Sequence, residues 1–228
     1  MKSYIRSWLS KRIQFARRED INNLYKQISS FIDLKDIIGP NVPMGPLRGW
    51  ALSPDALLIV LRDITERPSP RVVEFGSGES TIAIAAALKR RGDGTLTSFE
   101  HNEKFSRNIA ERLRRADLAS HVDLRVIPLR HYKGTASVPS FDSYDLSDQD
   151  IEFDVAIVDG PINILGSVTR SVPLEWAVSR LRRNGTIYLD DASREGERAA
   201  VEGLRAKWQG VVEEWLDCEK GLLRLRLG

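Results

Sequence analysis

A glycine turn between a buried strand and a helix carries the residue types that hold a small charged ligand. The strand is the apolar run Val72–Phe75, and Gly76 and Gly78 follow it directly. Glycine lets the chain turn sharply and lets a ligand approach the backbone. Ser80 and Thr81 then open an alanine-rich helix, whose free N–H groups attract an anion. The turn is therefore predicted to bind a ligand, although the glycines alone are also compatible with a plain strand-to-helix turn.

Two carboxylates beside this turn indicate the kind of cofactor. Glu74 precedes the turn, and Glu100 ends the next apolar run, Thr95–Glu100. In a doubly wound sheet, an acid at the end of the second strand receives the ribose hydroxyls. The dinucleotide fingerprint needs a third glycine where this chain has Thr81, and Glu74 would repel a pyrophosphate. S-adenosylmethionine fits better, because its amino group and sulfonium are positive and its carboxylate suits the helix N–H groups.

Four segments carry a resemblance to a known family. They are EFGSGEST at 74–81, SFEHN at 98–102, FDVAIVDGP at 153–161 and GTIYLDDASR at 185–194. In this order they resemble the strand-end motifs of class I S-adenosylmethionine-dependent methyltransferases, and more narrowly a bacterial branch with E-x-G-S-G-x-S-T, E-H and V-D-G-P motifs. The segment 48–55 is similar to the lead-in helix of that branch. The resemblance spans residues 45–228 and implies a fold and a cofactor, but no particular acceptor.

The turn and the resemblance together name the residues expected to contact the cofactor. They lie at the ends of the first, second and fourth predicted strands: Glu74, Gly76, Ser77, Gly78, Ser80, Thr81, Glu100, His101 and Asp159. Methyl transfer needs an aligned donor and acceptor and the exclusion of water, and a hydroxyl acceptor also needs a base. Asp159 is the candidate for that catalytic role, or for orienting the acceptor, because the fourth strand faces the sulfonium in this family. The alternative is a turn aspartate beside Gly160-Pro161.

Three aspartates at one edge raise the question of a metal. Asp159, Asp190 and Asp191 offer only oxygen ligands, which suit Mg²⁺ or Ca²⁺. Catechol-type O-methyltransferases chelate a diol acceptor with an Asp followed by an Asp-Asn pair. Ala192 follows Asp191 here, so the amide ligand is missing. We expect no metal, and a divalent ion is the alternative that is not favoured. Capping of the following helix is a second role open to Asp191.

Five residues are candidates for contact with the acceptor: Trp50, His131, Tyr132, Asp191 and Arg194. Trp50 can close over the methionine end of the cofactor or pack in the core. His131 and Tyr132 open a long polar segment after the third strand, where a solvated loop is the alternative for His131. Arg194 suits an acidic acceptor such as a uronic acid or a phosphate, and a solvated helical face is its alternative.

The composition is that of an ordinary globular protein, with 228 residues, 42% of them hydrophobic and 29% charged, and a net charge of +2. One domain with an N-terminal appendage is expected, and the near-neutral charge gives no case for a nucleic-acid partner. Cys218 is the single cysteine, which excludes an internal disulfide and a multi-cysteine metal site. No apolar run is long enough to span a membrane. Because Lys11 and Arg12 also interrupt any signal-peptide core, a cytoplasmic location is expected.

The N-terminal segment is predicted to be a helix over residues 1–38. With a Gly- and Pro-rich linker it forms the arm 1–44, which precedes the methyltransferase-like domain 45–228. Six basic residues stand before the first acid, Glu19: Lys2, Arg6, Lys11, Arg12, Arg17 and Arg18. A basic amphipathic helix of this kind is typical of peripheral membrane contact or of an anionic partner. The apolar stripe that continues to Ile32 favours instead an arm that packs on the domain or forms a homo-oligomer.

Strands and helices alternate from Arg71 onward, which predicts an α/β fold with a doubly wound, mostly parallel sheet of seven strands. The five parallel strands are predicted at Arg71–Phe75, Thr95–Glu100, Val122–Ile127, Phe153–Asp159 and Gly185–Asp190. Helices are predicted at Pro54–Thr65, Ser80–Arg91, Glu103–Ala116, Thr169–Arg183 and Ser193–Trp208. A terminal hairpin of Val211–Leu216 and Leu222–Leu227 adds the antiparallel C-terminal strand of the Rossmann-like methyltransferase fold. The polar segment Leu129–Glu152 is predicted to be a substrate-side flap or a plain surface insertion.

These features favour a methyltransferase that acts, at oxygen, on a small molecule or a glycan. Relatives in the resembling branch serve sugar and cell-surface polysaccharide pathways, so the glycan acceptor is an analogy. Two other functions remain open. One is an NAD-dependent oxidoreductase, and the other is a non-catalytic scaffold protein that keeps the fold and the cofactor and uses its N-terminal arm for assembly.

Overall fold

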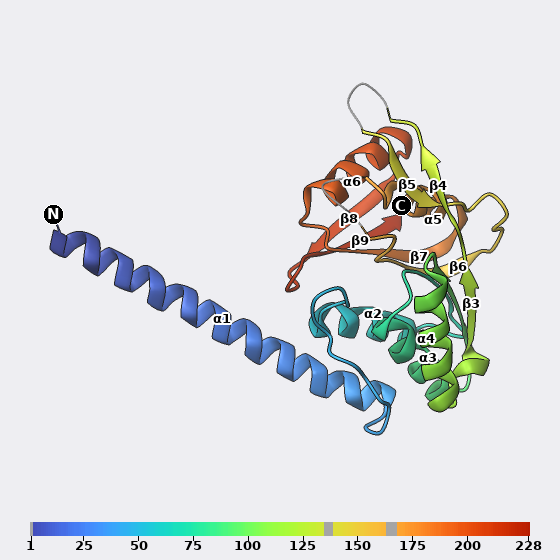
Figure 1. Cartoon of the computed structure of the whole chain (residues 1–228), viewed down its shortest axis with the longest axis horizontal. Helices are drawn as coiled ribbons and strands as arrows, with labels where there is room; N and C mark the ends of the chain where they lie inside the picture. The colour runs from blue at the N-terminus through green and yellow to red at the C-terminus, as the bar shows by residue number, and fades with distance from the viewer. Residues whose placement is uncertain (1, 135–138, 163–167) are drawn as a thin grey trace.

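The computed structural model describes residues 2–134, 139–162 and 168–228, with side chains from residue 18 onward. Its centre is a seven-stranded sheet in the order β3-β2-β1-β6-β7-β9-β8 (Figure 1). In chain order the strands are β1 Arg71–Phe75, β2 Thr95–Glu100, β3 Val122–Val126, β6 Phe153–Val158, β7 Leu181–Asp190, β8 Val211–Leu216 and β9 Leu222–Leu227. The pairs among β1, β2, β3, β6 and β7 are parallel, whereas β9 is antiparallel to both of its neighbours. The predicted doubly wound sheet with an antiparallel C-terminal strand is confirmed.

Helices cover both faces of this sheet (Figure 1). Those on one face are α2 Pro54–Glu66, α3 Glu79–Arg91 and α4 Glu103–Arg115, and those on the other are α5 Ser171–Arg180 and α6 Glu195–Lys207. Successive strand residues point to opposite faces. Accordingly, Val72 packs in the core under α2, α3 and α4, and Val73 packs in the core under α5 and α6. Burial on both faces explains why the central strands β1 and β6 are mostly apolar.

The segment after β3 is more ordered than the sequence predicts. Within Leu129–Glu152, β4 Leu129–Tyr132 and β5 Phe141–Tyr144 form an antiparallel hairpin. Tyr132 stacks on Phe141 with ring centroids 5.5 Å apart, and the Tyr144 side chain is fully buried. No strand was predicted in this segment, and the Tyr132–Phe141 pair stabilises the hairpin despite its polar residues. The substrate-side flap stays a prediction. Residues 135–138 lie outside the described part of the chain.

The boundary between α5 and β7 differs most from the prediction. Strand β7 begins at Leu181 rather than at Gly185, and helix α5 ends at Arg180 rather than at Arg183. Leu181 pairs with Phe153 at the start of β6, and a register shift follows before the regular ladder. The early pairing removes the last residues of the expected helix.

Helix α1 spans Lys2–Ile38, in agreement with the helix predicted over residues 1–38. Its C-terminal turns belong to the main core, since Leu34 and Ile38 are 1% and 2% exposed. Lys26 pairs with the buried Asp55 of α2, with 3.1 Å between Nζ and Oδ2. The N-terminal half extends away from the sheet and its helices (Figure 1). Within the described residues, no helix combines the length and the apolarity that crossing a membrane requires.

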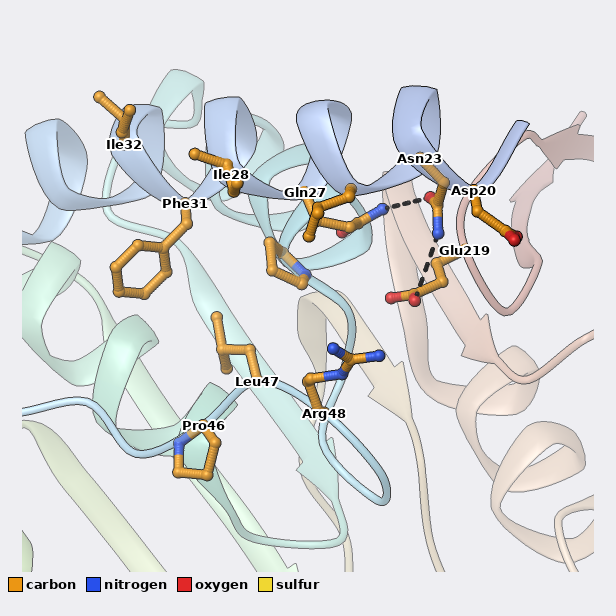
Figure 2. Close-up of a pocket in the computed structure, with 12 residues that line it drawn as sticks. Asp20, Asn23, Gln27, Ile28, Phe31, Ile32, Pro46, Leu47, Arg48 and Glu219 are labelled. Atoms are coloured by element: carbon orange, nitrogen blue, oxygen red, sulfur yellow. Dashed lines mark hydrogen bonds between the residues drawn. The ribbon is translucent and has the colours of Figure 1, made fainter. Parts of the chain in front are cut away.

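Helix α1 carries a stripe of apolar side chains that are more than half exposed: Ile21, Leu24, Tyr25, Ile28 and Ile32. Between α1 and the segment around Leu47 lies a groove of about 660 Å³. Figure 2 shows Phe31 directed into this groove and Asn23 hydrogen-bonded to Gln27 and to Glu219. The stripe predicted from the sequence therefore stays largely exposed, although Leu24, Ile28 and Ile32 also line the groove.

Candidate active site

The turn between β1 and α3 has the conformation that its glycines allow. Gly76 has φ +96°, in the left-handed region, and its N–H donates to the carbonyl of Phe99 at 2.8 Å. A Cβ at this position would lie 3.1 Å from the backbone nitrogen of Gly160. The Gly78 N–H donates to the Thr81 hydroxyl at 2.8 Å. The turn is thus held between β2 and β6, and only glycine fits at Gly76 without strain.

Glu74 supports this turn from behind. Its side chain is fully buried and accepts hydrogen bonds from three hydroxyls, those of Ser80, Thr81 and Ser98. Burial raises the pKa of Glu74 to about 6, although the three hydroxyls act in the opposite direction. The carboxylate is absent from the cavity lining described below. The structure therefore places Glu74 where it braces the start of α3, and its predicted contact with the cofactor stays a prediction.

We expect Glu74→Gln to flatten the pH dependence of the unfolding free energy. The folded pKa of about 6 exceeds the ordinary value of 4.5, so the folded protein binds more protons than the unfolded chain. The contribution of Glu74 to the free energy of unfolding is therefore fully present below about pH 4.5. It falls by ~2 kcal/mol as the pH rises through 6. Glutamine cannot ionise and escapes this loss.

Urea unfolding between pH 4 and 8 measures the effect. The free energy of unfolding of Glu74→Gln relative to wild type should rise with pH across this window. For the control Glu103→Gln, at an exposed position, the difference from wild type should stay constant with pH. A constant difference between wild type and Glu74→Gln would contradict the assignment.

Glu100 ends β2 with its carboxylate at the carboxyl edge of the sheet. One oxygen accepts from the N–H and the hydroxyl of Ser77, at 3.2 and 3.3 Å. The other accepts from the N–H of Asn102 at 2.8 Å and lies 3.1 Å from Nδ1 of His101. Burial alone would raise the pKa of Glu100, but the neighbouring His101 and the hydrogen bond from Asn102 lower it overall. An ionised acceptor therefore stands beside the glycine turn, as the ribose prediction requires.

One cavity of about 390 Å³ joins these elements. It lies at the carboxyl ends of β1, β2 and β6, the edge where open α/β sheets bind ligands, and its size is within the range of small-molecule sites. The lining residues predicted for the cofactor are Gly76, Ser77, Gly78, Ser80, Glu100, His101 and Asp159. Three apolar side chains at its opening, Trp50, Phe105 and Ile162, are 46–69% exposed. The structure thus brings the predicted turn, the predicted ribose acid and the predicted base into one cavity.

Asp159 follows β6 and faces this cavity with a strongly perturbed carboxylate. Its Oδ1 accepts from Nη2 of Arg170 at 3.1 Å, and its backbone carbonyl accepts from the same nitrogen at 2.7 Å. Burial and the neighbouring Asp190 raise the pKa of Asp159 well above its ordinary value, and Arg170 opposes that rise. Perturbation of this kind in a cavity is typical of catalytic groups.

The residues predicted to contact the acceptor are distributed unevenly. Trp50 lines the cavity. His131 is exposed on the hairpin with Nδ1 2.8 Å from Oδ1 of Asp142, and the Tyr132 hydroxyl donates to the Tyr144 carbonyl at 3.0 Å. Neither lines the cavity, and the same holds for Asp191 and Arg194, which form an ion pair at 2.9 Å.

The role of helix cap considered for Asp191 is wrong. Helix α6 begins at Glu195, and its N-cap is Arg194. Asp191 instead adopts φ +56° in the turn before that helix. Its buried carboxylate receives ion pairs from Arg170 and Lys220 as well as Arg194.

Several residues of the site were missed by reasoning on the sequence. Arg170 lines the cavity with a side chain that is 3% exposed, and Tyr144 reaches the same cavity from the hairpin. Glu79 pairs with Arg112 at 2.5 Å and accepts from the Gly45 N–H at 2.6 Å, which ties the segment between α1 and α2 to α3 and α4. Arg170 lay inside a predicted helix, and a single arginine there gives no signal of burial.

The sheet order, the antiparallel β9 and the cavity beside the glycine turn define the Rossmann-like methyltransferase fold. The family model of the methyltransferase domain matches residues 73–192, just over half of the chain, so this protein belongs to the methyltransferase domain family. No curated protein sequence matches the chain.

Solved structures of methyltransferases share this fold. One is a methyltransferase of Podospora anserina bound to SAH (S-adenosylhomocysteine), with a TM-score of 0.60, 15% identity, and coverage of 87% of this chain and 88% of the other. An O-methyltransferase of Bacillus cereus in complex with SAH has a TM-score of 0.58 and 18% identity over 88% and 91% of the two chains. The Streptomyces achromogenes O-methyltransferase involved in tomaymycin synthesis, in complex with SAM, has a TM-score of 0.55 and 17% identity over 88% of each chain.

Proposed function

We propose that this protein is an S-adenosylmethionine-dependent methyltransferase that methylates an oxygen of a small molecule or a glycan. One observation carries the proposal: the glycine turn, the Glu100 carboxylate and Asp159 line a single cavity. The O-methyltransferases among the similar structures support oxygen as the acceptor atom. The analogy of the strand-end motifs with sugar-modifying relatives supports a glycan acceptor.

Each part of the cavity has a role in holding the cofactor. The N-terminus of α3 at Ser80 offers free N–H groups to the carboxylate of the methionine end. Glu100 accepts hydrogen bonds from the ribose hydroxyls. Its existing hydrogen bonds from Ser77 and Asn102 keep the carboxylate ionised and in one orientation. Trp50 and Phe105 cover the opening with apolar surface, which excludes water from the reaction. When bound, S-adenosylmethionine supplies a methyl group on a good leaving group.

Asp159 takes the proton of the acceptor hydroxyl or orients that hydroxyl. Its raised pKa brings a carboxylate, normally a weak base, closer to neutral pH, where general bases are most effective. Arg170 holds both the side chain and the backbone carbonyl of Asp159, so the carboxylate keeps one orientation. A positively charged cofactor in the cavity favours the ionised form of this acid.

Calorimetry and a methyl-transfer assay test the proposal in two steps. We expect S-adenosylhomocysteine to bind with a 1:1 stoichiometry and NAD not to bind. Binding of NAD instead would favour the oxidoreductase. Transfer of a labelled methyl group from S-adenosylmethionine to a member of a panel of glycans and small hydroxylated acceptors would support catalysis. Cofactor binding without transfer to any member would favour the non-catalytic scaffold.

Glu100→Ala is expected to weaken binding of S-adenosylhomocysteine by ~1.5–3 kcal/mol, because a charged acceptor loses its hydrogen bonds to the ribose diol. Calorimetry on the folded variant measures the loss. Glu103→Ala is the matched control, since this glutamate is exposed on the following helix and should leave the affinity unchanged. An unaltered affinity in Glu100→Ala would rule out the ribose assignment.

A further inference from the structure

The three aspartates considered as metal ligands do come together. Ligand oxygens of Asp159, Asp190 and Asp191 lie within 4.8 Å of one another. Carboxylates in this arrangement suit a hard divalent cation. Whether a divalent cation can bind here therefore depends on whether these carboxylate oxygens are free to coordinate it.

Arg170 already occupies the space among these oxygens. Its Nη2 is 3.1 Å from Oδ1 of Asp159 and 3.3 Å from Oδ2 of Asp191. Its Nη1 donates to the backbone carbonyl of Asp190 at 2.8 Å and lies 3.5 Å from the buried Glu197 carboxylate. One guanidinium thus contacts the carboxylates of Asp159 and Asp191 and the backbone carbonyl of Asp190. Because its charge is fixed and it cannot lose a proton, a divalent ion would meet a permanent positive charge at hydrogen-bond distance from its own ligands.

Two further cations pair with carboxylates of the cluster, although Oδ1 of Asp190 keeps no hydrogen-bond partner among the described residues. Lys220, on the turn before β9, places Nζ 3.2 Å from Oδ2 of Asp190 and 3.7 Å from Oδ1 of Asp191. Arg194 reaches the Asp191 carboxylate from the more exposed side, at 2.9 Å. The amide ligand of the catechol-type site is replaced by Ala192. The residues present therefore do not fit a divalent metal.

We infer that Arg170, assisted by Lys220, takes the place of a divalent cation in this site, and that Arg170 is the positioning residue that orients Asp159 without a metal. The consequence for catalysis rests on the proposed methyltransferase function, but the occupation of the metal position does not. Removal of the guanidinium charge should therefore convert the cluster into a metal site. No metal-binding residue has to be introduced for that conversion.

Titration of the full-length protein with Mn²⁺, followed by the electron paramagnetic resonance of the free ion, tests this inference. Wild type should show no saturable site up to ~1 mM, the range in which weak carboxylate sites fill. Arg170→Gln keeps a hydrogen-bond donor but no charge, and Arg170→Ala removes both. Each should bind one Mn²⁺ at least ~100-fold more tightly than wild type, because an uncompensated group of buried carboxylates attracts a cation strongly. The added substitution Asp191→Asn should abolish the new site.

Arg170→Lys is the matched control, because it changes the packing but keeps the positive charge, and it should bind no Mn²⁺. Stoichiometric binding of Mn²⁺ to wild type at micromolar concentration would overturn the inference even if no variant folds. So would the absence of a new site in neutral variants whose circular dichroism matches wild type, or an equal gain in Arg170→Lys. If Mn²⁺ binding follows the expectation but no acceptor is methylated, the proposed function fails and the cation assignment stands.

Discussion

Asp159→Asn is expected to lower turnover by ~10²–10⁴ while affinity for S-adenosylhomocysteine stays within a few-fold, because an amide cannot accept the proton of the acceptor hydroxyl. The pH profile should change as well. Burial and Asp190 raise the pKa of Asp159, so a wild-type enzyme that needs the ionised form loses kcat/KM as the pH falls through that raised value. Asp159→Asn should lose this acid limb. Steady-state kinetics with a methylated acceptor from the panel, over pH 5–9, measures both effects.

The control for this variant is Asp148→Asn, an exposed aspartate in the segment after β5, which should retain full activity. Wild type is expected to remain fully active in EDTA, since Arg170 supplies the positive charge beside Asp159. Normal turnover of Asp159→Asn would reduce Asp159 to a turn residue. Activity that is lost in EDTA and restored only by Mg²⁺ would overturn the metal-free mechanism.

Gly76→Val is expected to abolish cofactor binding. The residue has φ +96°, which costs a β-branched side chain roughly 1–3 kcal/mol. Its Cβ would also lie 3.1 and 3.2 Å from the backbone of Gly160, so the turn and the segment after β6 would have to move apart. Both segments line the cavity. Calorimetry with S-adenosylhomocysteine measures the loss.

Gly203→Val serves as the control, because a side chain at this position of α6 meets open space and needs no unusual backbone angle. It should bind the cofactor normally. If Gly76→Val does not fold, Gly76→Ala, with the same backbone strain and a smaller side chain, should fold and bind more weakly than wild type. Normal binding by either Gly76 variant would show that the first strand-turn is not the cofactor loop.

The fold and the cofactor edge could be predicted because their signals are local. Alternating apolar runs and helix patterns indicated the strands, and glycine at 76 marked a turn that other residues adopt only with strain. The end of β2 placed Glu100 at the carboxyl edge through the parallel topology alone, and the structure puts it in the cavity. The hairpin β4–β5 was missed because its stability comes from contacts such as Tyr132 on Phe141, which join residues separated by a polar stretch.

The pairing of buried charged side chains with residues from distant parts of the sequence could not be predicted from the sequence. Local patterns in the sequence were enough to predict a doubly wound sheet, a glycine turn after its first strand, and acids at the ends of β2, β6 and β7. The folded chain was needed to show that Glu74 turns to three hydroxyls behind the turn, and that Arg170 and Lys220 contact the three aspartates. The physical reason is that strand ends follow from local periodicity and topology. The partner of a buried charge, in contrast, is chosen among all segments that the fold brings within a few ångströms.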